Sequence, residues 1–151
     1  QGQVDQLDGR IAELMQEHQL ILSVPGVGPV LGAAILGEIG DISRFSDAKH
    51  LRAYAGLDVT VYQSGEFQGS RARLSKRGSP YLRRALWQAA MVASVHDPIF
   101  RDFYQTKRTQ GKHPKQALGA VAGKLCNVIY AVLSKGKKYD PNYSKENSST
   151  T

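Results

Sequence analysis

Three prolines, Pro80, Pro98 and Pro114, constrain the fold of this chain more than any other feature of its sequence. Proline is favoured at the first position of a helix, because the N–H that it lacks would have no partner there and its fixed φ already suits the helix. Ser79 and Asp97, whose side chains can accept hydrogen bonds from the first free amides, precede two of them. The sequence therefore predicts three consecutive helices, over 80–94, 98–109 and 114–135.

The N-terminal half shows a second helical signal. Apolar residues spaced by three and four, as on one face of a helix, run through 4–22 and again through 30–36, ending near Gly40. Ser46 and Asp47 supply capping side chains for a short helix that Gly56 ends. These segments and the three proline-started helices predict a mainly helical fold.

A short segment near the middle of the chain departs from this pattern. Residues 58–62 alternate between polar and apolar side chains and include β-branched residues, a pattern that predicts a strand. The turn residues over 64–69 predict a hairpin or loop after it. The expected fold class is therefore mainly α, a helical domain with a helix-hairpin-helix-like element and a small central β-hairpin or loop.

The domain organisation follows from the same patterns. A chain of 151 residues can bury one core of ordinary size. We expect 1–22 to be the end of a coiled-coil-like helix and 23–139 to be the main domain. The polar residues of 140–151 have little to bury and are expected to be a disordered tail. Because the chain starts at Gln1, we expect it to be a fragment of a longer protein.

The charge of the chain points to a polyanionic partner. Twenty Lys and Arg face thirteen Asp and Glu, for a net charge of +7 and an isoelectric point of about 9.6. The single cysteine, Cys126, excludes a disulfide framework and a zinc cluster and is interpreted as a small core residue. No apolar run of membrane-spanning length and no signal peptide are found, so we expect a cytoplasmic protein with no membrane partner.

The turn between the first two predicted helices, within about 20–40, is a candidate phosphate contact. In Pro25–Gly26–Val27–Gly28, two glycines would let the backbone bend close to a phosphate. The amides that open the next helix would then point at the anion, and the helix dipole would favour it. Gly26 and Gly28 are therefore predicted nucleic-acid contacts. A plain helical hairpin, in which the glycines only permit close packing, is the alternative.

A basic segment after the predicted strand is a second candidate. Arginine side chains can bind phosphate oxygens in pairs, so a run of cations without an acid can hold a nucleic-acid backbone. A solvated charged face is the alternative interpretation. The six predicted contacts fall within fourteen residues and are Arg71, Arg73, Lys76, Arg77, Arg83 and Arg84.

Ser64 is the candidate nucleophile. It follows the predicted strand, precedes Gly65 and lies just before the basic segment. A serine that attacks phosphorus needs exposure, a permissive backbone and positive charge to stabilise the transition state. A turn serine that hydrogen-bonds its own backbone is the alternative that local sequence leaves open.

Several motifs together resemble the insertion-sequence one-ten family of transposases, and the resemblance covers roughly 20–139. The motifs occur in the family's order, and their combination is specific although each alone is not. They are Ser23–Val24–Pro25–Gly26–Val27–Gly28, Phe45, Leu51-x-x-Tyr54–Ala55–Gly56–Leu57, Tyr62–Gln63–Ser64–Gly65, Leu74–Ser75–Lys76–Arg77–Gly78 and Leu82–Arg83–Arg84–Ala85–Leu86.

The resemblance implies more than the residues alone. It implies a bacterial recombinase that joins DNA through a covalent serine–phosphate intermediate, with Ser64 as the nucleophile, and a homo-oligomer. Members of the family carry an N-terminal RNase-H-like domain with four acidic metal-binding residues, and some are guided by a structured RNA. That acidic domain is absent from this sequence. We therefore expect no metal site or cofactor here, magnesium in the full-length enzyme only, and an isolated fragment that is inactive.

Two other functions remain open at this point. One is a non-catalytic helix-hairpin-helix module that binds duplex DNA, in which Ser64 is only a turn residue. The other is an RNA-binding protein of ribosomal type, which the size and charge of the chain would also suit.

Overall fold

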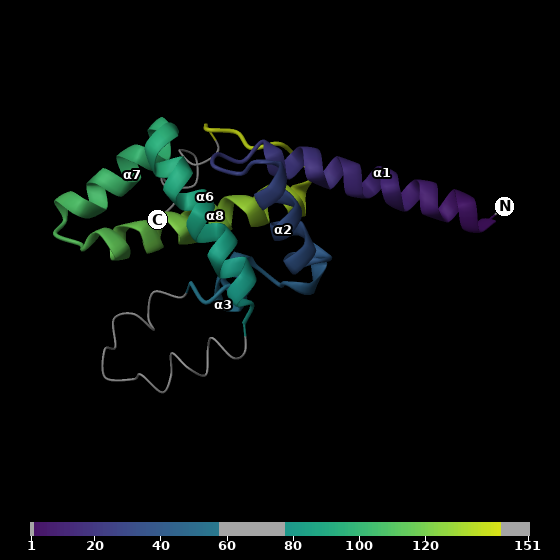
Figure 1. The fold of residues 1–151 in the computed structure, drawn as a ribbon, viewed down its shortest axis with the longest axis horizontal. Coiled ribbons are helices and arrows are strands. Elements are labelled where there is room, and N and C mark those ends of the chain that lie inside the picture. The colour runs from purple at the N-terminus through teal and green to yellow at the C-terminus, as the bar shows by residue number, and fades with distance from the viewer. Residues whose placement is uncertain (1, 58–77, 143–151) are drawn as a thin grey trace.

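The computed structural model describes residues 2–57 and 78–142, which form a helical structure (Figure 1). The mainly α fold class is confirmed for this part of the chain, whereas the strand predicted over 58–62 and the following hairpin lie outside it. The elements in chain order are α1 (Gly2–Leu22), α2 (Pro29–Ile39), a 3-10 turn η1 (Ile42–Arg44), α3 (Ala48–Tyr54), α6 (Pro80–His96), α7 (Pro98–Thr109) and α8 (Pro114–Lys135).

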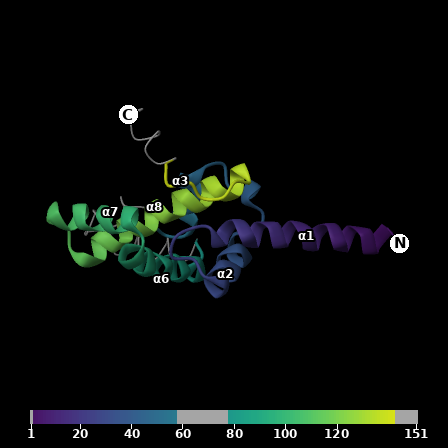
Figure 2. The same cartoon turned by 90° about the horizontal axis from the view of Figure 1, so that it is seen from above.

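Helix α8 is the centre of the core. It contacts α1, α3, α6 and α7, and the two views show it running through the body of the molecule (Figures 1 and 2). Its length and composition would also allow a membrane span, but a core helix passes the same test. Its buried residues are Ala117, Val121, Ala122, Gly123, Leu125, Cys126, Ile129 and Val132. Helix α8 is therefore the core helix against which α1, α3, α6 and α7 pack, whereas α2 packs on α1 and α6.

The proline-started helices begin where the sequence predicts. The Ser79 hydroxyl accepts from the Leu82 amide at 3.0 Å. The Asp97 carboxylate accepts from the Ile99 and Phe100 amides, at 3.1 Å each. These contacts confirm both caps, because each occupies helix amides that would otherwise have no partner.

The caps of two other helices differ from the prediction or add to it. Asp47 rather than Ser46 caps α3, because its carboxylate accepts from the His50 amide at 2.8 Å. The backbone N–H of Ser46 donates to the His50 ring instead. His113 caps α8, accepting from the Lys115 amide, and sequence did not predict this because histidine is not among the preferred capping residues.

Helix α1 is confirmed as a helix, and its N-terminal part extends away from the other elements (Figure 1). Within the described structure only Leu20 and Ile21 of this helix are buried. Its remaining apolar residues are exposed to solvent; they are Val4, Leu7, Ile11, Leu14, Met15 and Leu22. The pairing of this helix in a coiled coil stays a prediction.

Gly26 allows the turn between α1 and α2 to pack directly on α6. Its φ is +83°, and a Cβ atom at this position would lie 2.2 Å from the carbonyl oxygen of Ala89 and 3.0 Å from the amide nitrogen of Ala93. Both atoms belong to the α6 backbone and cannot move away independently. Close packing is therefore sufficient to explain a glycine at this position.

We predict that Gly26→Ala destabilises the chain and that Gly28→Ala does not. The first change adds a left-handed backbone penalty to a steric clash, which together cost about 2–4 kcal/mol. Gly28 has a φ of −91° and open space around its Cβ position, so it serves as the matched control. Guanidinium unfolding of both variants measures the difference. Equal unfolding midpoints would contradict the packing described for Gly26.

We also predict that Cys126 is unreactive until the chain unfolds. Burial raises the pKa of the Cys126 thiol to about 12. Because the thiolate is the reactive form, a disulfide reagent at pH 8 should react roughly a thousandfold more slowly with the folded chain than with the chain in guanidinium. Similar rates in the two conditions would show that the thiol is accessible in the folded state.

Candidate nucleic-acid interface

The end of α3 and the start of α6 lie together and form the base of the candidate site. The Ser79 amide donates to the carbonyl of Tyr54 at 2.8 Å, and the Leu57 amide donates to the carbonyl of Arg52 at 2.9 Å. The chain therefore leaves the described structure after Leu57 and re-enters it at Gly78 close to the same place. We call this place, made by residues 52–57 and 78–84, the α3–α6 junction.

Five of the predicted site residues belong to the segment between Leu57 and Gly78. They lie outside the described residues and are Ser64, Arg71, Arg73, Lys76 and Arg77. Their assignments stay predictions. The structure does place the two ends of their segment at the α3–α6 junction, and two further predicted residues, Arg83 and Arg84, belong to the same junction.

Ser79 holds the junction together. Its hydroxyl donates to the Glu38 carboxylate of α2 at 2.7 Å while accepting from the Leu82 amide of α6. Its amide bonds to Tyr54 of α3, so one residue with only 7% of its surface exposed joins three helices. A buried polar residue with these partners fixes the relative positions of the helices, because losing any partner would leave a polar group unsatisfied.

Arg83 and Arg84 occupy the first turns of α6 in different environments. Arg83 is half-buried and lies over Gly56, where a Cβ atom would come within 3.0 Å of its Nη1. Gly56 has a φ of +71°, which favours glycine, whereas the end of the Arg83 side chain could shift to make room for a Cβ atom. Arg84 is exposed. Arg83 is thus positioned at the junction, and the Arg84 side chain is directed to solvent.

Arg44 lies beside the α3–α6 junction, and no sequence pattern indicated it. Its guanidinium carbon lies 5.1 Å from the centre of the Phe45 ring and 5.6 Å from that of Tyr54, which are cation–π distances. The residue is exposed and sits in η1, a turn that the helical periodicity does not reveal. An arginine next to an aromatic residue was the one available signal. The described part of the α3–α6 junction thus carries Arg52, Arg83 and Arg84, and Arg44 lies beside it against the Tyr54 ring.

The predicted contacts Gly26 and Gly28 lie elsewhere. Gly26 packs on Ala89 and Ala93 in the second half of α6, whereas Arg83 is in its first half. Gly28 is the N-cap of α2, with no side-chain cap, and the adjacent Val30 is 83% exposed. The N-terminus of α2 is therefore open to solvent, as phosphate binding would require. Among the described residues, Gly26 and Gly28 therefore do not cluster with Arg83 and Arg84.

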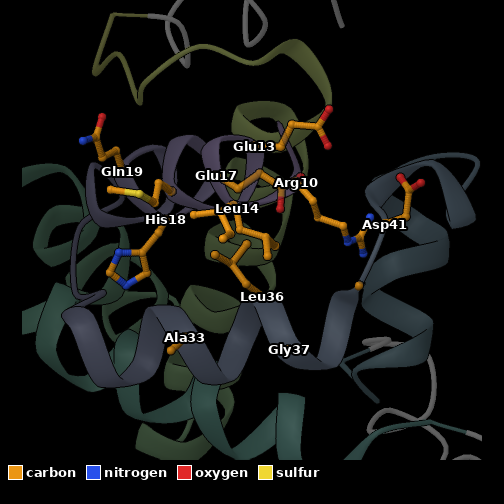
Figure 3. A pocket seen from close by; sticks show the side chains of 13 residues that line it. Arg10, Glu13, Leu14, Glu17, His18, Gln19, Ala33, Leu36, Gly37 and Asp41 are labelled. Atoms are coloured by element: carbon orange, nitrogen blue, oxygen red, sulfur yellow. The ribbon is translucent and has the colours of Figure 1, made fainter. Parts of the chain in front are cut away.

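A hollow that the described residues line lies in a different place. A groove of about 810 Å³ separates α1 from α2, and Figure 3 shows Leu14 and Leu36 across it, with Arg10 extending toward Asp41. The hydrogen bond from the Ser43 amide lowers the pKa of the Asp41 carboxyl, with a smaller contribution from Arg10. Three acids and one arginine line the groove, which does not suit a polyanion.

The described residues offer no metal-ligand set. No three His, Cys, Asp or Glu side chains converge anywhere in residues 2–57 and 78–142. The residues described here therefore do not fit a magnesium site of the kind expected for the full-length enzyme.

Comparison with known proteins identifies the family of this chain. Residues 18–105 match the Transposase IS116/IS110/IS902 family. The chain is 36% identical over 143 residues to the insertion element IS900 uncharacterized 42 kDa protein of Mycobacterium paratuberculosis, covering 92% of this chain and 36% of that protein. It is 34% identical over 139 residues to the pilin gene-inverting protein of Moraxella bovis, covering 91% and 43%.

A further relative carries the word transposase in its name. The mini-circle putative transposase for IS117 of Streptomyces coelicolor is 31% identical over 140 residues, covering 90% of this chain and 33% of that protein. The chain thus spans between a third and a half of the length of these relatives. The chain belongs to the Transposase IS116/IS110/IS902 family.

We predict that Ser79→Ala loosens the α3–α6 junction. Loss of the cap and of the Glu38 contact should cost about 1–2 kcal/mol of unfolding free energy. Ser94→Ala is the matched control in the same helix, because the Ser94 hydroxyl only bonds back to the Met91 carbonyl. Guanidinium unfolding compares the two variants. If both are equally stable, Ser79 does not hold the junction as described.

Proposed function

We propose that this chain is the C-terminal part of a transposase that binds DNA and supplies Ser64 as the nucleophile for strand cleavage and rejoining. The observation that carries the proposal is the family match over 18–105, which includes Ser64 and the whole α3–α6 junction. The Tyr62–Gln63–Ser64–Gly65 motif, in the position expected for the family's nucleophile, supports the choice of serine.

The proposed chemistry is a transfer of phosphate between oxygens. The Ser64 hydroxyl gives its proton to a base and forms a bond to a DNA phosphorus, and the bond from that phosphorus to one strand oxygen breaks. The departing oxygen leaves as a protonated hydroxyl. A new DNA hydroxyl then attacks the serine phosphodiester and releases Ser64. The number of phosphodiester bonds is conserved, so the exchange needs no nucleotide hydrolysis.

Positive charge near Ser64 would serve two purposes. Arg71, Arg73, Lys76 and Arg77 precede the junction in sequence, and Arg83 and Arg84 lie at it. The guanidinium groups of arginine can bind non-bridging phosphate oxygens and stabilise the charge that develops as the new bond forms. The same cations hold the DNA backbone, and the open N-terminus of α2 after Gly28 offers amides to a further phosphate.

The remaining parts of the proposal concern the full-length protein. We place the magnesium-binding acids in a separate N-terminal domain, so the isolated chain should bind DNA without recombining it. A guide RNA is a candidate second partner. The exposed apolar face of α1 supports a homo-oligomer, because such a face is more stable when it is covered. We place the protein in the bacterial cytoplasm, where its DNA substrate is found.

A non-catalytic module that binds duplex DNA is the second candidate function. The observation that favours it is the helix–turn–helix formed by α1, the turn over 23–28 and α2, with its uncapped α2 N-terminus. In that case Ser64 would be a turn residue and all binding would be to the DNA backbone.

We expect Ser64→Ala in the full-length protein to abolish strand exchange, by at least about a thousandfold, while DNA affinity stays within about twofold, since only the bond-forming oxygen is removed. Ser70→Ala is the matched control, because it removes a hydroxyl from the same basic segment. A plasmid recombination assay and trapping of a covalent protein–DNA adduct provide the measurements. Strand exchange by Ser64→Ala at the control's rate would exclude Ser64 as the nucleophile and favour the binding module.

We expect the double substitution Arg83→Gln and Arg84→Gln to weaken duplex DNA binding by this chain. If both arginines contact phosphates, the slope of log affinity against log salt should become shallower by about 2. Fluorescence anisotropy over a salt series measures the slope. Arg83 also packs on Gly56, so Arg84→Gln alone, whose side chain is exposed, gives the cleaner single-contact value of about 1. A wild-type affinity that does not change with salt would contradict DNA backbone binding altogether.

A further inference from the structure

The C-terminal half of the chain contains a long stretch without any acidic residue. Between Asp102 and Asp140 there is no Asp or Glu, although this stretch includes α8 and the second half of α7. An imbalance of this kind produces a positive potential that no neighbouring carboxylate in sequence reduces. The cations of the stretch are Lys107, Arg108, Lys112, Lys115, Lys124, Lys135, Lys137 and Lys138.

Four of these cations surround the turn between α7 and α8, which lies at the end of the molecule opposite the N-terminus of α1 (Figure 1). We call Lys107, Arg108, Lys112 and Lys115 the α7–α8 tip. The turn is well fixed. The Gly111 amide donates to the Arg108 carbonyl at 3.0 Å, the Lys112 amide donates to the Lys107 carbonyl at 3.2 Å, and Arg108 Nη1 donates to the Lys112 carbonyl at 2.9 Å.

The positive charge continues from the tip along the packed pair of helices. The ammonium groups of Lys107 from α7 and Lys124 from α8 lie 5.2 Å and 4.6 Å from the centre of the same ring, that of Phe103. Burial lowers the pKa of the Lys124 ammonium, which indicates that the charge is held at a cost. Asp97 partly offsets this effect of burial. Two ammonium groups on one ring also repel each other, so a further anion would stabilise this arrangement.

The N-terminal amides of α8 do not account for the charge at the tip. His113 already accepts from the Lys115 amide, and Gln116 accepts from the His113 amide, so the helix end is capped from within the chain. Binding at the tip would therefore depend on the lysine and arginine side chains. Lys115 is exposed and Lys112 is half-buried, and neither side chain makes a hydrogen bond or ion pair within the described residues.

We infer that the α7–α8 tip is a second contact surface for the phosphate backbone of duplex DNA, separate from the α3–α6 junction. The inference rests on the proposed function, because it assumes that DNA is the partner of this chain. Duplex DNA presents about one negative charge per 1.7 Å of its axis, so a backbone crossing the tip can meet several cations at once. Contacts of this kind set the position of DNA on a protein without reading its sequence.

The first test compares two charge-matched double variants of the 151-residue chain. Lys112→Gln with Lys115→Gln removes two cations from the tip and leaves Arg108 in place to fix the turn. Arg10→Gln with Lys137→Gln removes the same charge from α1 and from beyond the far end of α8. The tip variant should bind duplex DNA roughly tenfold to a hundredfold more weakly near 0.1 M salt, with a slope shallower by about 2 than that of the control variant.

A second test maps the position of the DNA without changing any charge. Gln110→Cys introduces a reactive cysteine at the turn, and Gln6→Cys introduces one near the start of α1. The native Cys126 is buried and unreactive, so an iron–EDTA reagent attaches only at the new position. We expect the reagent at residue 110 to cleave bound duplex DNA and the reagent at residue 6 not to do so.

The outcomes separate this inference from the proposed function. Suppose that the wild-type chain binds DNA with a steep salt dependence, but the two double variants have equal slopes and the reagent at residue 110 does not cleave. These results would overturn the tip surface alone. A wild-type chain without salt-dependent binding would overturn the proposed function first. If the tip variant loses affinity for an RNA duplex of the same length but not for DNA, the surface belongs to RNA and the inference as stated is wrong.

Discussion

The buried hydroxyl of Ser79 is the contact on which the arrangement of the candidate site depends. It joins the C-terminal part of α2 through Glu38 and the start of α6 through Leu82, while the Ser79 amide holds the end of α3. Because all of these bonds are at least partly shielded from water, each is worth more than a surface hydrogen bond. They bring the two ends of the segment that carries Ser64 to one place. The segment that carries the basic residues and the candidate nucleophile therefore begins and ends at residues that these hydrogen bonds hold in place.

Helix α8 provides the second requirement, a core that supports this base. Its apolar residues are buried against α3 and α6, so the helices that form the junction both rest on the same element. The α7–α8 turn belongs to that element too. A domain built around one long helix can present positive charge at the junction and at the tip, and its rigidity keeps the two surfaces at a constant separation. In the proposed function, such rigidity would preserve the alignment of bound DNA during strand exchange.

Gly26 and Gly28 have different structural roles, although they are only two positions apart. Sequence analysis treated both as contacts to phosphate. The structure places Gly26 against the backbone of α6, where any side chain would collide with Ala89, while Gly28 opens α2 toward solvent with room around it. Packing is sufficient to explain a glycine at the first position, and phosphate binding stays a prediction for both. Sequence could not separate these roles because both demand a small residue in a turn, and only the position of α6 distinguishes them.

Helix boundaries, two of the caps and the mainly helical class were determined by sequence, because proline, serine, aspartate and the period of apolar residues act over a few neighbouring positions. Sequence also indicated Ser64 and its basic neighbours through their local pattern and family resemblance. Tertiary structure alone decided that Glu38, Tyr54 and Ser79 meet, that Arg44 lies over the ring of Tyr54, and that Lys107 and Lys124 share the ring of Phe103. Each of these contacts joins residues from different helices. Their positions follow from how the apolar faces pack on α8, and no local pattern in the chain records that packing.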